Sequence, residues 1–184
     1  MCSNVSMKNN LRKIAKEKRK LISCSSLNEK IKQNLFSLDV YKNAKNIMCY
    51  YSIGSEVSTL DFFLDKTKKW YLPRIEGDEL LVCPYVENKF IENQFKILEP
   101  TTSPIENLNS LDLVIVPAIC ADSNGYRIGY GKGFYDRFLK KLPNTCKKVV
   151  LVYSALFFNS VYPDFYDEKS DYVVTELNIT NVNC

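Results

Sequence analysis

The chain has 184 residues, of which 46% are hydrophobic and 25% charged, and this suits one globular domain spanning residues 1–184. The net charge of +4 does not indicate the dense basic stripe of a nucleic-acid-binding protein. No apolar run reaches the roughly 18 residues of a transmembrane helix, so we expect neither nucleic acid nor a membrane as a partner. Histidine is absent, which excludes Ser-His-Asp triads, Cys-His pairs and histidine zinc sites. Any chemistry must therefore rest on carboxylates, lysine, arginine, tyrosine, backbone amides or a metal held by oxygen.

Seven cysteines are scattered along the chain, and the two that lie nearest in sequence, Cys2 and Cys24, are 22 residues apart. No C-x-x-C pair exists to hold zinc or to exchange disulfides. An odd, scattered set predicts free thiols in a reducing compartment, and we expect a cytoplasmic protein. The N-terminus lacks the apolar stretch of a secretory signal, although its lysine-rich start leaves an organelle transit peptide as an alternative.

The first third of the chain predicts two helices, a buried strand and a short third helix. Residues 7–22 carry apolar side chains at helical spacing, with lysines on the opposite face. The sequence Ser-Leu-Asn-Glu at 26–29 fits a capping box that opens a second helix reaching Leu35. Residues 46–53 are apolar and bounded by a glycine, which indicates a buried strand. Ser58 can then cap a short helix.

The rest of the chain alternates strands with one further helix. Residues 70–72 predict a strand that Pro73 stops. Further strands are expected at 80–86, 113–116, 149–153 and 172–175, and a helix at 134–141. The pattern predicts an α/β fold, a single-domain three-layer sandwich with a mostly parallel sheet flanked by helices. Ligands of such sheets bind beyond the carboxyl ends of the strands.

Glycine is concentrated in one loop that follows the strand at 113–116. Four of the six glycines lie between residues 125 and 133, within DSNGYRIGYGKGFYDR (122–137). Glycine lets the backbone approach a ligand closely, and a helix N-terminus after such a loop favours anions. Arg127 and Lys132 add positive charge. We therefore favour a phosphate site here over the alternative, a flexible turn.

The loop matches neither standard nucleotide motif. Phe134 stands where G-x-G-x-x-G needs its third glycine, and Lys132 is followed by Gly133 where a P-loop has Ser or Thr. Tyr126 stands where a P-loop needs its first glycine. The sequence therefore predicts a different kind of phosphate cradle.

The stretch VPAICADSNGYRIGYGKGFYDRFL (116–139) closely resembles the signature of 5-formyltetrahydrofolate cyclo-ligases, also called methenyltetrahydrofolate synthetases. Further matching pieces are K-N-N-L-R at 8–12, Y-Y-S at 50–52, E-V-S-T at 56–59, L-P-R at 72–74 and the P-x-x-x-D element at 163–167. Motif order and chain length also agree, so the resemblance covers nearly the whole chain. The glycine signature is its specific part.

The resemblance implies an enzyme that uses ATP and Mg²⁺ to convert 5-formyltetrahydrofolate, in polyglutamylated form, into 5,10-methenyltetrahydrofolate, with release of ADP and phosphate. The formyl oxygen takes the γ-phosphoryl group, the 10-nitrogen attacks the activated carbon, and phosphate leaves. Phosphoryl transfer depends on positioning and charge neutralisation more than on a protein nucleophile, so a histidine-free site suffices. We expect a monomer or weak dimer.

The resemblance also implies roles for individual residues. It assigns ATP binding to Lys8, Arg12, Arg127, Ile128, Gly129, Tyr130, Gly131, Lys132, Gly133, Phe134 and Tyr135. It assigns folate binding to Tyr51, Glu56, Tyr130, Gly131, Lys132, Gly133 and Phe134. Catalytic roles go to Lys132, Arg127 and Tyr135, and magnesium binding goes to Asp136 and Asp167. Glu56 suits the task because a carboxylate can pair with the donor edge of a pterin.

Other interpretations of these residues stay open. Lys8 and Arg12 also fit a solvated helix face, and Asp136 fits a helix N-terminus stabilised by the helix dipole. Tyr50 and Tyr51 alternate on a strand, so one of them is expected in the core. As a whole, the chain could instead be a sugar-phosphate isomerase that needs no ATP. It could also be a nucleic-acid-binding module whose binding weakens steeply with salt.

The chain departs from the family pattern at three places. Phe134 precedes Tyr135 where the family often has paired tyrosines, so one hydroxyl is lost. Residues 154–158 lack a glutamine that relatives often carry, and Tyr166 replaces a histidine before the late aspartate. These differences affect the fine contacts of the pocket and leave the reaction class unchanged.

Overall fold

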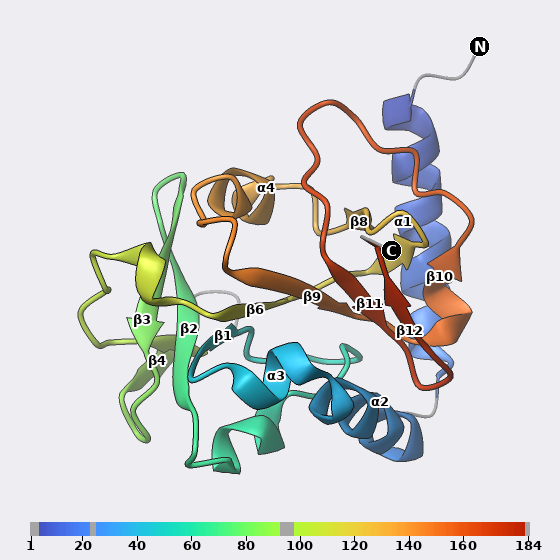
Figure 1. The fold of residues 1–184 in the computed structure, drawn as a ribbon. Coiled ribbons are helices and arrows are strands. Elements are labelled where there is room, and N and C mark those ends of the chain that lie inside the picture. The colour runs from blue at the N-terminus through green and yellow to red at the C-terminus, as the bar shows by residue number, and fades with distance from the viewer. Residues whose placement is uncertain (1–3, 23–24, 93–97, 183–184) are drawn as a thin grey trace.

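Figure 1 shows the fold in a computed structural model, which describes residues 4–22, 25–92 and 98–182. The α-helices within these ranges are α1 (Asn4–Lys20), α2 (Ser25–Ser37), α3 (Asp39–Asn43) and α4 (Phe134–Leu139). Short 3₁₀ helices occur at η1 (Leu60–Leu64), η2 (Leu108–Ser110) and η3 (Ser154–Leu156). None of the helices in these ranges is both long and apolar enough to cross a membrane.

A seven-stranded sheet forms the centre of the fold, in the order β12-β11-β9-β6-β1-β2-β3. Its strands are β1 (Asn46–Cys49), β2 (Lys69–Glu76), β3 (Glu79–Pro84), β6 (Leu113–Val116), β9 (Lys147–Leu151), β11 (Tyr172–Val174) and β12 (Ile179–Asn181). The five inner strands are parallel, while β3 and β12 are antiparallel edges. The expectation of an α/β fold with a mostly parallel sheet is confirmed.

Two smaller sheets accompany the large one. The first has the order β10-β7-β8, from β7 (Cys120–Asp122), β8 (Arg127–Ile128) and β10 (Phe157–Phe158). The second pairs β4 (Phe90–Glu92) with β5 (Leu98–Pro100). The sequence predicted none of these five strands, because segments of two or three residues carry no readable periodicity.

Helices lie on both faces of the large sheet. Figure 1 shows α2 and α3 against one face and α4 with the β7–β8 hairpin on the other. Between these layers the central strand β6 (LVIV) is fully buried. A strand covered on both faces needs such a continuous apolar run, which is why the sequence revealed it.

Several strand ends differ from the prediction, and the structure explains those of β1 and β2. β1 stops at Cys49 rather than at residue 53, because the chain turns so that Thr59 Oγ1 donates to the Tyr50 carbonyl at 2.7 Å. β2 continues through Pro73 to Glu76. Strand β1 pairs with Lys69–Tyr71 of β2 and does not extend alongside Pro73. Proline has no N–H to donate, so it is tolerated at this unpaired side of β2.

Helix α1 confirms the predicted apolar face only in part. Ala15 is buried and Leu11 packs against the core, whereas Ile14 is 43% and Leu21 87% exposed. Arg19 is also buried on this helix. Both apolar packing and polar contacts therefore position α1.

The strand order reverses between β1 and β6, because the chain moves outward from β1 to β2 and β3 and then returns to the other side of β1. Crevices beyond the carboxyl ends of two such strands are the usual ligand sites of open α/β sheets. Residues 50–59 follow β1, and the glycine-rich segment lies downstream of β6 and includes the short strand β8. Both therefore lie at the predicted edge.

Candidate functional site

The first part of the glycine-rich segment is a structural hairpin and not part of a cradle. Strands β7 and β8 pair antiparallel, and the buried Asp122 holds the turn by accepting hydrogen bonds from the N–H groups of Asn124 (3.0 Å) and Tyr126 (3.1 Å). Gly125 has φ +83°, and a Cβ there would lie 2.6 Å from the Ser170 carbonyl oxygen. Gly125 is therefore required for close packing. Of the glycine-rich segment that we expected to bind phosphate, residues 129–133 remain the candidate loop.

Residues 129–133 form an irregular loop that leads into α4. Gly131 (φ +98°) and Gly133 (φ +69°) adopt backbone conformations that favour glycine. The side chain of Lys132 is exposed between them, while its carbonyl accepts a hydrogen bond from Arg137 at 3.1 Å. Helix α4 has only six residues, shorter than predicted, so the loop and the side chains around it must provide most of any anion binding.

Cations of α1 face this loop. Lys8, Arg12, Lys16 and Arg19 recur at helical spacing, and each is at least half-buried. Arg12 Nε donates to the Gly129 carbonyl at 2.9 Å, and a Cβ on Gly131 would lie 3.7 Å from the Arg12 guanidinium. Lys16 Nζ lies 5.4 Å from the centre of the Tyr130 ring. The alternative of a solvated face therefore does not hold for Lys8 and Arg12, because the cationic face of α1 packs against the protein.

Glu56 lies beside the same loop, near the carboxyl end of β1. It is only 7% exposed, and its Oε2 accepts a hydrogen bond from the Ile53 N–H at 2.9 Å. Tyr130 donates its hydroxyl proton to Glu56 Oε1 at 2.7 Å. Burial, followed by the neighbouring Glu56 charge, raises the pKa of Tyr130 to about 12, so the phenol stays protonated and remains a donor.

Arg19 is a site residue that the sequence analysis missed. Its Nη2 donates to the Tyr130 hydroxyl at 3.0 Å and its Nε to Ser55 Oγ at 3.1 Å, while Nη1 reaches the Ala118 carbonyl at 3.5 Å. The signal that could have found it is its position seven residues after Arg12, two helical turns along the same face.

Arg127 lies beneath the loop and not at its surface. Its side chain is 4% exposed, and Nη2 forms an ion pair with Asp136 Oδ1 at 3.1 Å. Its Nη1 donates to the Glu168 carbonyl at 3.2 Å, and its guanidinium lies 6.0 Å from the Tyr135 ring centre. The neighbouring Ile128 belongs to the core, and its carbonyl accepts the Ile119 N–H. In this structure Arg127 acts as an anchor, and the Ile128 side chain faces the interior.

Lys8 joins α1 to the loop before β11. Its Nζ donates to Asp164 Oδ2 at 2.7 Å and also to Asp167 Oδ2. Burial lowers the pKa of Lys8, but hydrogen bonds to these two carboxylates outweigh that effect, and the pKa is raised overall. Lys8 therefore stays charged at neutral pH.

The two predicted magnesium ligands lie on segments that contact each other. The Glu168 N–H donates to Asp136 Oδ1 at 3.3 Å, which brings Asp136 beside the segment that carries Asp167. Carboxylate oxygens suit Mg²⁺, and among the described residues nothing donates a hydrogen bond to Asp136 Oδ2 or Asp167 Oδ1. Within residues 4–22, 25–92 and 98–182 there is no group of three His, Cys, Asp or Glu side chains that could hold a metal. Both carboxylates already pair with cations, Asp136 with Arg127 and Asp167 with Lys8, and the two together can supply only part of the coordination of a magnesium ion.

Tyr135 and Phe134 lie at the start of α4. The Tyr135 hydroxyl is buried and accepts or donates no hydrogen bond within the described residues. Burial, with smaller contributions from Cys49 and Glu56, raises its pKa, so it stays a neutral phenol. Phe134, where relatives often carry a tyrosine, packs its ring 5.2 Å from the Arg137 guanidinium.

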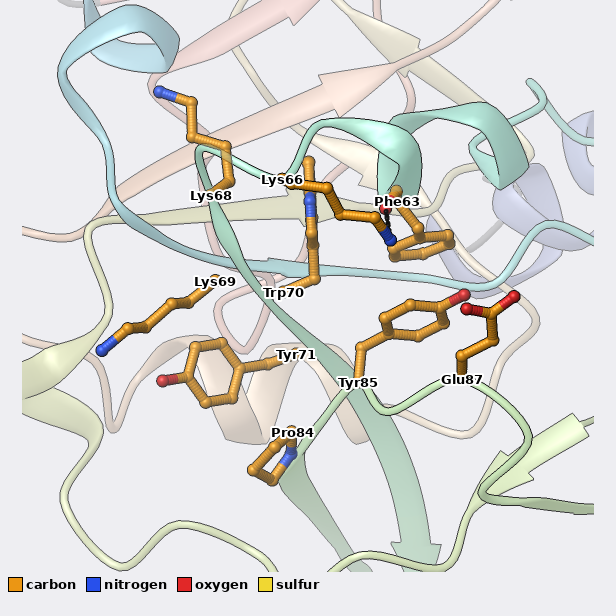
Figure 2. Close-up of a pocket in the computed structure, with 9 residues that line it drawn as sticks. All are labelled: Phe63, Lys66, Lys68, Lys69, Trp70, Tyr71, Pro84, Tyr85 and Glu87. Carbon is orange, nitrogen blue, oxygen red and sulfur yellow. Dashed lines mark hydrogen bonds between the residues drawn. The ribbon is translucent and has the colours of Figure 1, made fainter.

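Tyr51 lies in an aromatic cluster. As expected, one of the paired tyrosines is core: Tyr50 is buried and donates to the Val57 carbonyl at 2.9 Å. The Tyr51 ring stacks 6.1 Å from Phe63, which in turn stacks 4.6 Å from Tyr85. Phe63 and Tyr85 also line a pocket of about 320 Å³ beside the start of β2, drawn in Figure 2. The structure therefore brings Glu56, Tyr130 and the α1 cations Lys16 and Arg19 together, while Tyr51 contacts the aromatic rings of Phe63 and Phe90.

Comparison with known proteins matches this architecture to one family. The sequence profile of the 5-formyltetrahydrofolate cyclo-ligase family matches residues 5–176. The chain belongs to this family. The family assignment confirms the resemblance drawn from the glycine signature, and it identifies the chain as an enzyme, a ligase of folate one-carbon metabolism.

Individual cyclo-ligases are similar to this chain over most of their length. A Mycoplasma genitalium 5-formyltetrahydrofolate cyclo-ligase is 31% identical, over 90% of this chain and 93% of its own. The Mycoplasma pneumoniae cyclo-ligase is also 31% identical, over 80% of this chain and 85% of its own. The solved structure of an Aquifex aeolicus 5,10-methenyltetrahydrofolate synthetase superimposes with a TM-score of 0.86 at 33% identity, covering 97% of this chain and 94% of that one.

Proposed function

We propose that this cyclo-ligase uses ATP and Mg²⁺ to cyclise 5-formyltetrahydrofolate to 5,10-methenyltetrahydrofolate, releasing ADP and phosphate. The observation that carries the proposal is the inward-facing row of cations on α1, which packs against the glycine loop beside the buried Glu56. Such an arrangement puts an anion site and a carboxylate next to each other at the carboxyl edge of the sheet. ATP and a pterin with a donor edge need this combination.

ATP phosphates are proposed to bind between α1 and residues 129–133. Arg12 lies against the glycine loop and supplies a full positive charge there. Lys132 is exposed beside it, and its ammonium can reach a bound phosphate. Fixed cations around a transferring phosphoryl group stabilise the charge that is redistributed in the transition state.

The folate is proposed to bind at Glu56, whose two oxygens accept from Ile53 and Tyr130 in this structure. Each carboxylate oxygen can accept two hydrogen bonds, so a pterin donor edge can pair with Glu56 while Ile53 and Tyr130 keep their contacts. This puts the formyl group beside residues 130–134, next to the proposed phosphate site. The formyl group and the phosphate site must lie close together, because the formyl oxygen attacks the γ-phosphorus of ATP.

The chemical steps need no protein nucleophile. The formyl oxygen attacks the γ-phosphorus and ADP leaves; the 10-nitrogen then attacks the activated formyl carbon, and the carbon–oxygen bond breaks to release phosphate. Asp136 and Asp167 would hold Mg²⁺, which neutralises phosphate charge when bound. Arg127 fixes Asp136 through their ion pair, and the uncharged Tyr135 hydroxyl offers one unused hydrogen bond beneath the loop.

The test is to mix the purified chain with ATP, MgCl₂ and 5-formyltetrahydrofolate and to follow the absorbance of methenyltetrahydrofolate. Product should form only when nucleotide and metal are both present. A sugar phosphate in place of ATP serves as the control for a different phosphate-handling enzyme and should give no product. Equal turnover without nucleotide, or no turnover under any condition, contradicts the proposal.

A further inference from the structure

Arg19 lies at the centre of a contact that joins three segments far apart in sequence. The α1 helix supplies Arg19, the glycine loop supplies Tyr130, and the loop after β1 supplies Glu56. Arg19 and Glu56 are each 7% exposed. Among the described residues, no carboxylate pairs directly with Arg19, and a buried arginine of this kind needs an explanation because burying an uncompensated charge is costly.

The hydrogen-bond chemistry of the tyrosine hydroxyl gives that explanation. A phenol has one proton to donate and lone pairs that accept, whereas a guanidinium can only donate. Since Arg19 Nη2 donates to Tyr130 Oη at 3.0 Å, the only phenol proton is free to point at Glu56 Oε1, 2.7 Å away. The positive charge of Arg19 therefore compensates Glu56 through the hydroxyl between them.

We propose that Arg19 is a positioning residue of the folate site: it fixes the Tyr130 hydroxyl toward Glu56 and so holds the glycine loop against the loop after β1. The inference rests on the proposed function, in which Glu56 binds the folate. The two other contacts of Arg19, to Ser55 Oγ (3.1 Å) and the Ala118 carbonyl (3.5 Å), keep the guanidinium in place. Arg12 retains its own contact to Gly129, so ATP binding depends much less on Arg19.

A double-mutant cycle separates this role from a merely structural one. Arg19→Met should raise the KM for 5-formyltetrahydrofolate about 10-fold, as expected for losing a charge-assisted hydrogen bond. The KM for ATP should change by less than about threefold. In a Tyr130→Phe background the same Arg19→Met change should cost less than about twofold, because the hydroxyl it orients is gone.

The matched control is Lys20→Met, which removes a neighbouring α1 cation that is 66% exposed and pairs with Glu17 on the helix surface. This variant should keep both KM values. If Arg19→Met does not fold, Arg19→Lys replaces it in the cycle. Lysine keeps a donor and the positive charge but lacks the planar guanidinium that donates to several acceptors at once. Equal losses in the wild-type and Tyr130→Phe backgrounds overturn the proposal, as does an equal rise of both KM values.

The experiment also separates this proposal from the proposed function. If the wild-type chain makes no methenyltetrahydrofolate, the proposed function fails. The four proteins of the cycle are the wild type, Arg19→Met, Tyr130→Phe and the double variant. They are then compared by urea unfolding, which requires no activity. Additive changes in unfolding free energy overturn the positioning contact, and non-additive changes support it.

Discussion

Replacing Arg127 by methionine tests whether this arginine anchors the glycine loop or binds ATP directly. The resemblance to the cyclo-ligases implies ATP contact and a catalytic role. The structure instead shows a side chain that is 4% exposed and paired with Asp136 at 3.1 Å. Methionine reproduces the apolar stem of arginine without the guanidinium, so the change removes the charge and the hydrogen bonds to Asp136 and Glu168.

The expected loss of stability follows from these contacts. Removing one partner of a buried ion pair costs about 3–5 kcal/mol, because the remaining charge is left uncompensated. Asp136 keeps 28% of its side chain exposed, so water can solvate part of its charge, and we expect about 2–3 kcal/mol. Adding Asp136→Asn removes the stranded carboxylate charge and should restore about 1 kcal/mol.

Urea unfolding of the two variants gives the stability change, and steady-state kinetics with varied ATP gives the effect on the site. Arg127→Met should lower the denaturation midpoint by about 1 M and raise the KM for ATP together with a fall in turnover. A variant within about 0.5 kcal/mol of wild-type stability but with a KM for ATP raised tenfold or more refutes the anchor role. Arg127 would then be a direct ligand.

Three further predictions concern glycine, the thiols and Lys132. Gly125→Ala should destabilise the protein by more than about 2 kcal/mol in thermal unfolding, since its Cβ meets the Ser170 carbonyl at 2.6 Å; Gly54→Ala, with similar backbone strain but nothing within 4 Å, should cost only about 1 kcal/mol. Burial raises the pKa of Cys120 and Cys146 to about 12 and also raises that of Cys49 and Cys83, so at most three of the seven thiols should react with a thiol reagent at pH 8 in the native state. Fast labelling of more than three thiols contradicts this expectation. The unfolding free energy should also fall as the pH rises above 9.0, the ordinary thiol pKa, because the unfolded thiols ionise there while the native ones stay protonated. Lys132→Met should lower turnover roughly 10- to 150-fold, and turnover within twofold of wild type would mean that backbone amides suffice.

The sequence predicted those parts of the fold whose patterns are local. The apolar run of β6 and the glycine-rich segment beyond it could be read directly, because each depends on adjacent residues. The carboxyl-edge position of Glu56 followed from the same logic, since it comes a few residues after a buried strand. Boundaries moved by a few residues, as helix and strand ends usually do.

The relation between α1 and the rest of the protein could not be predicted in this way. The contact from Arg12 to Gly129 spans 117 positions, and that from Lys8 to Asp167 spans 159. No periodicity within a helix states which distant loop it meets. Lys8 and Arg12 therefore also fitted a solvated face, whereas tertiary contacts turn both inward and leave Leu21 exposed.

The roles of Arg127 and Asp136 were also beyond the sequence. Both lie in the family signature, so the resemblance assigned ATP binding to Arg127 and magnesium binding to Asp136. Whether two charged side chains bind ligands or each other depends on backbone geometry, and here they form an ion pair beneath the loop. The same applies to Gly125, whose tight packing against Ser170 distinguishes it from the neighbouring glycines.

Calorimetric titration of two variants tests most directly the claim that the α1 cations and Glu56 form adjoining sites for ATP and folate. Arg12→Met should weaken the binding of magnesium-ATP roughly 10- to 150-fold and leave 5-formyltetrahydrofolate binding within about twofold. Glu56→Gln should do the reverse, weakening the folate about 5- to 150-fold while the nucleotide binds as in the wild type. Unchanged affinities in both variants, or equal losses of both ligands in each, would contradict the account.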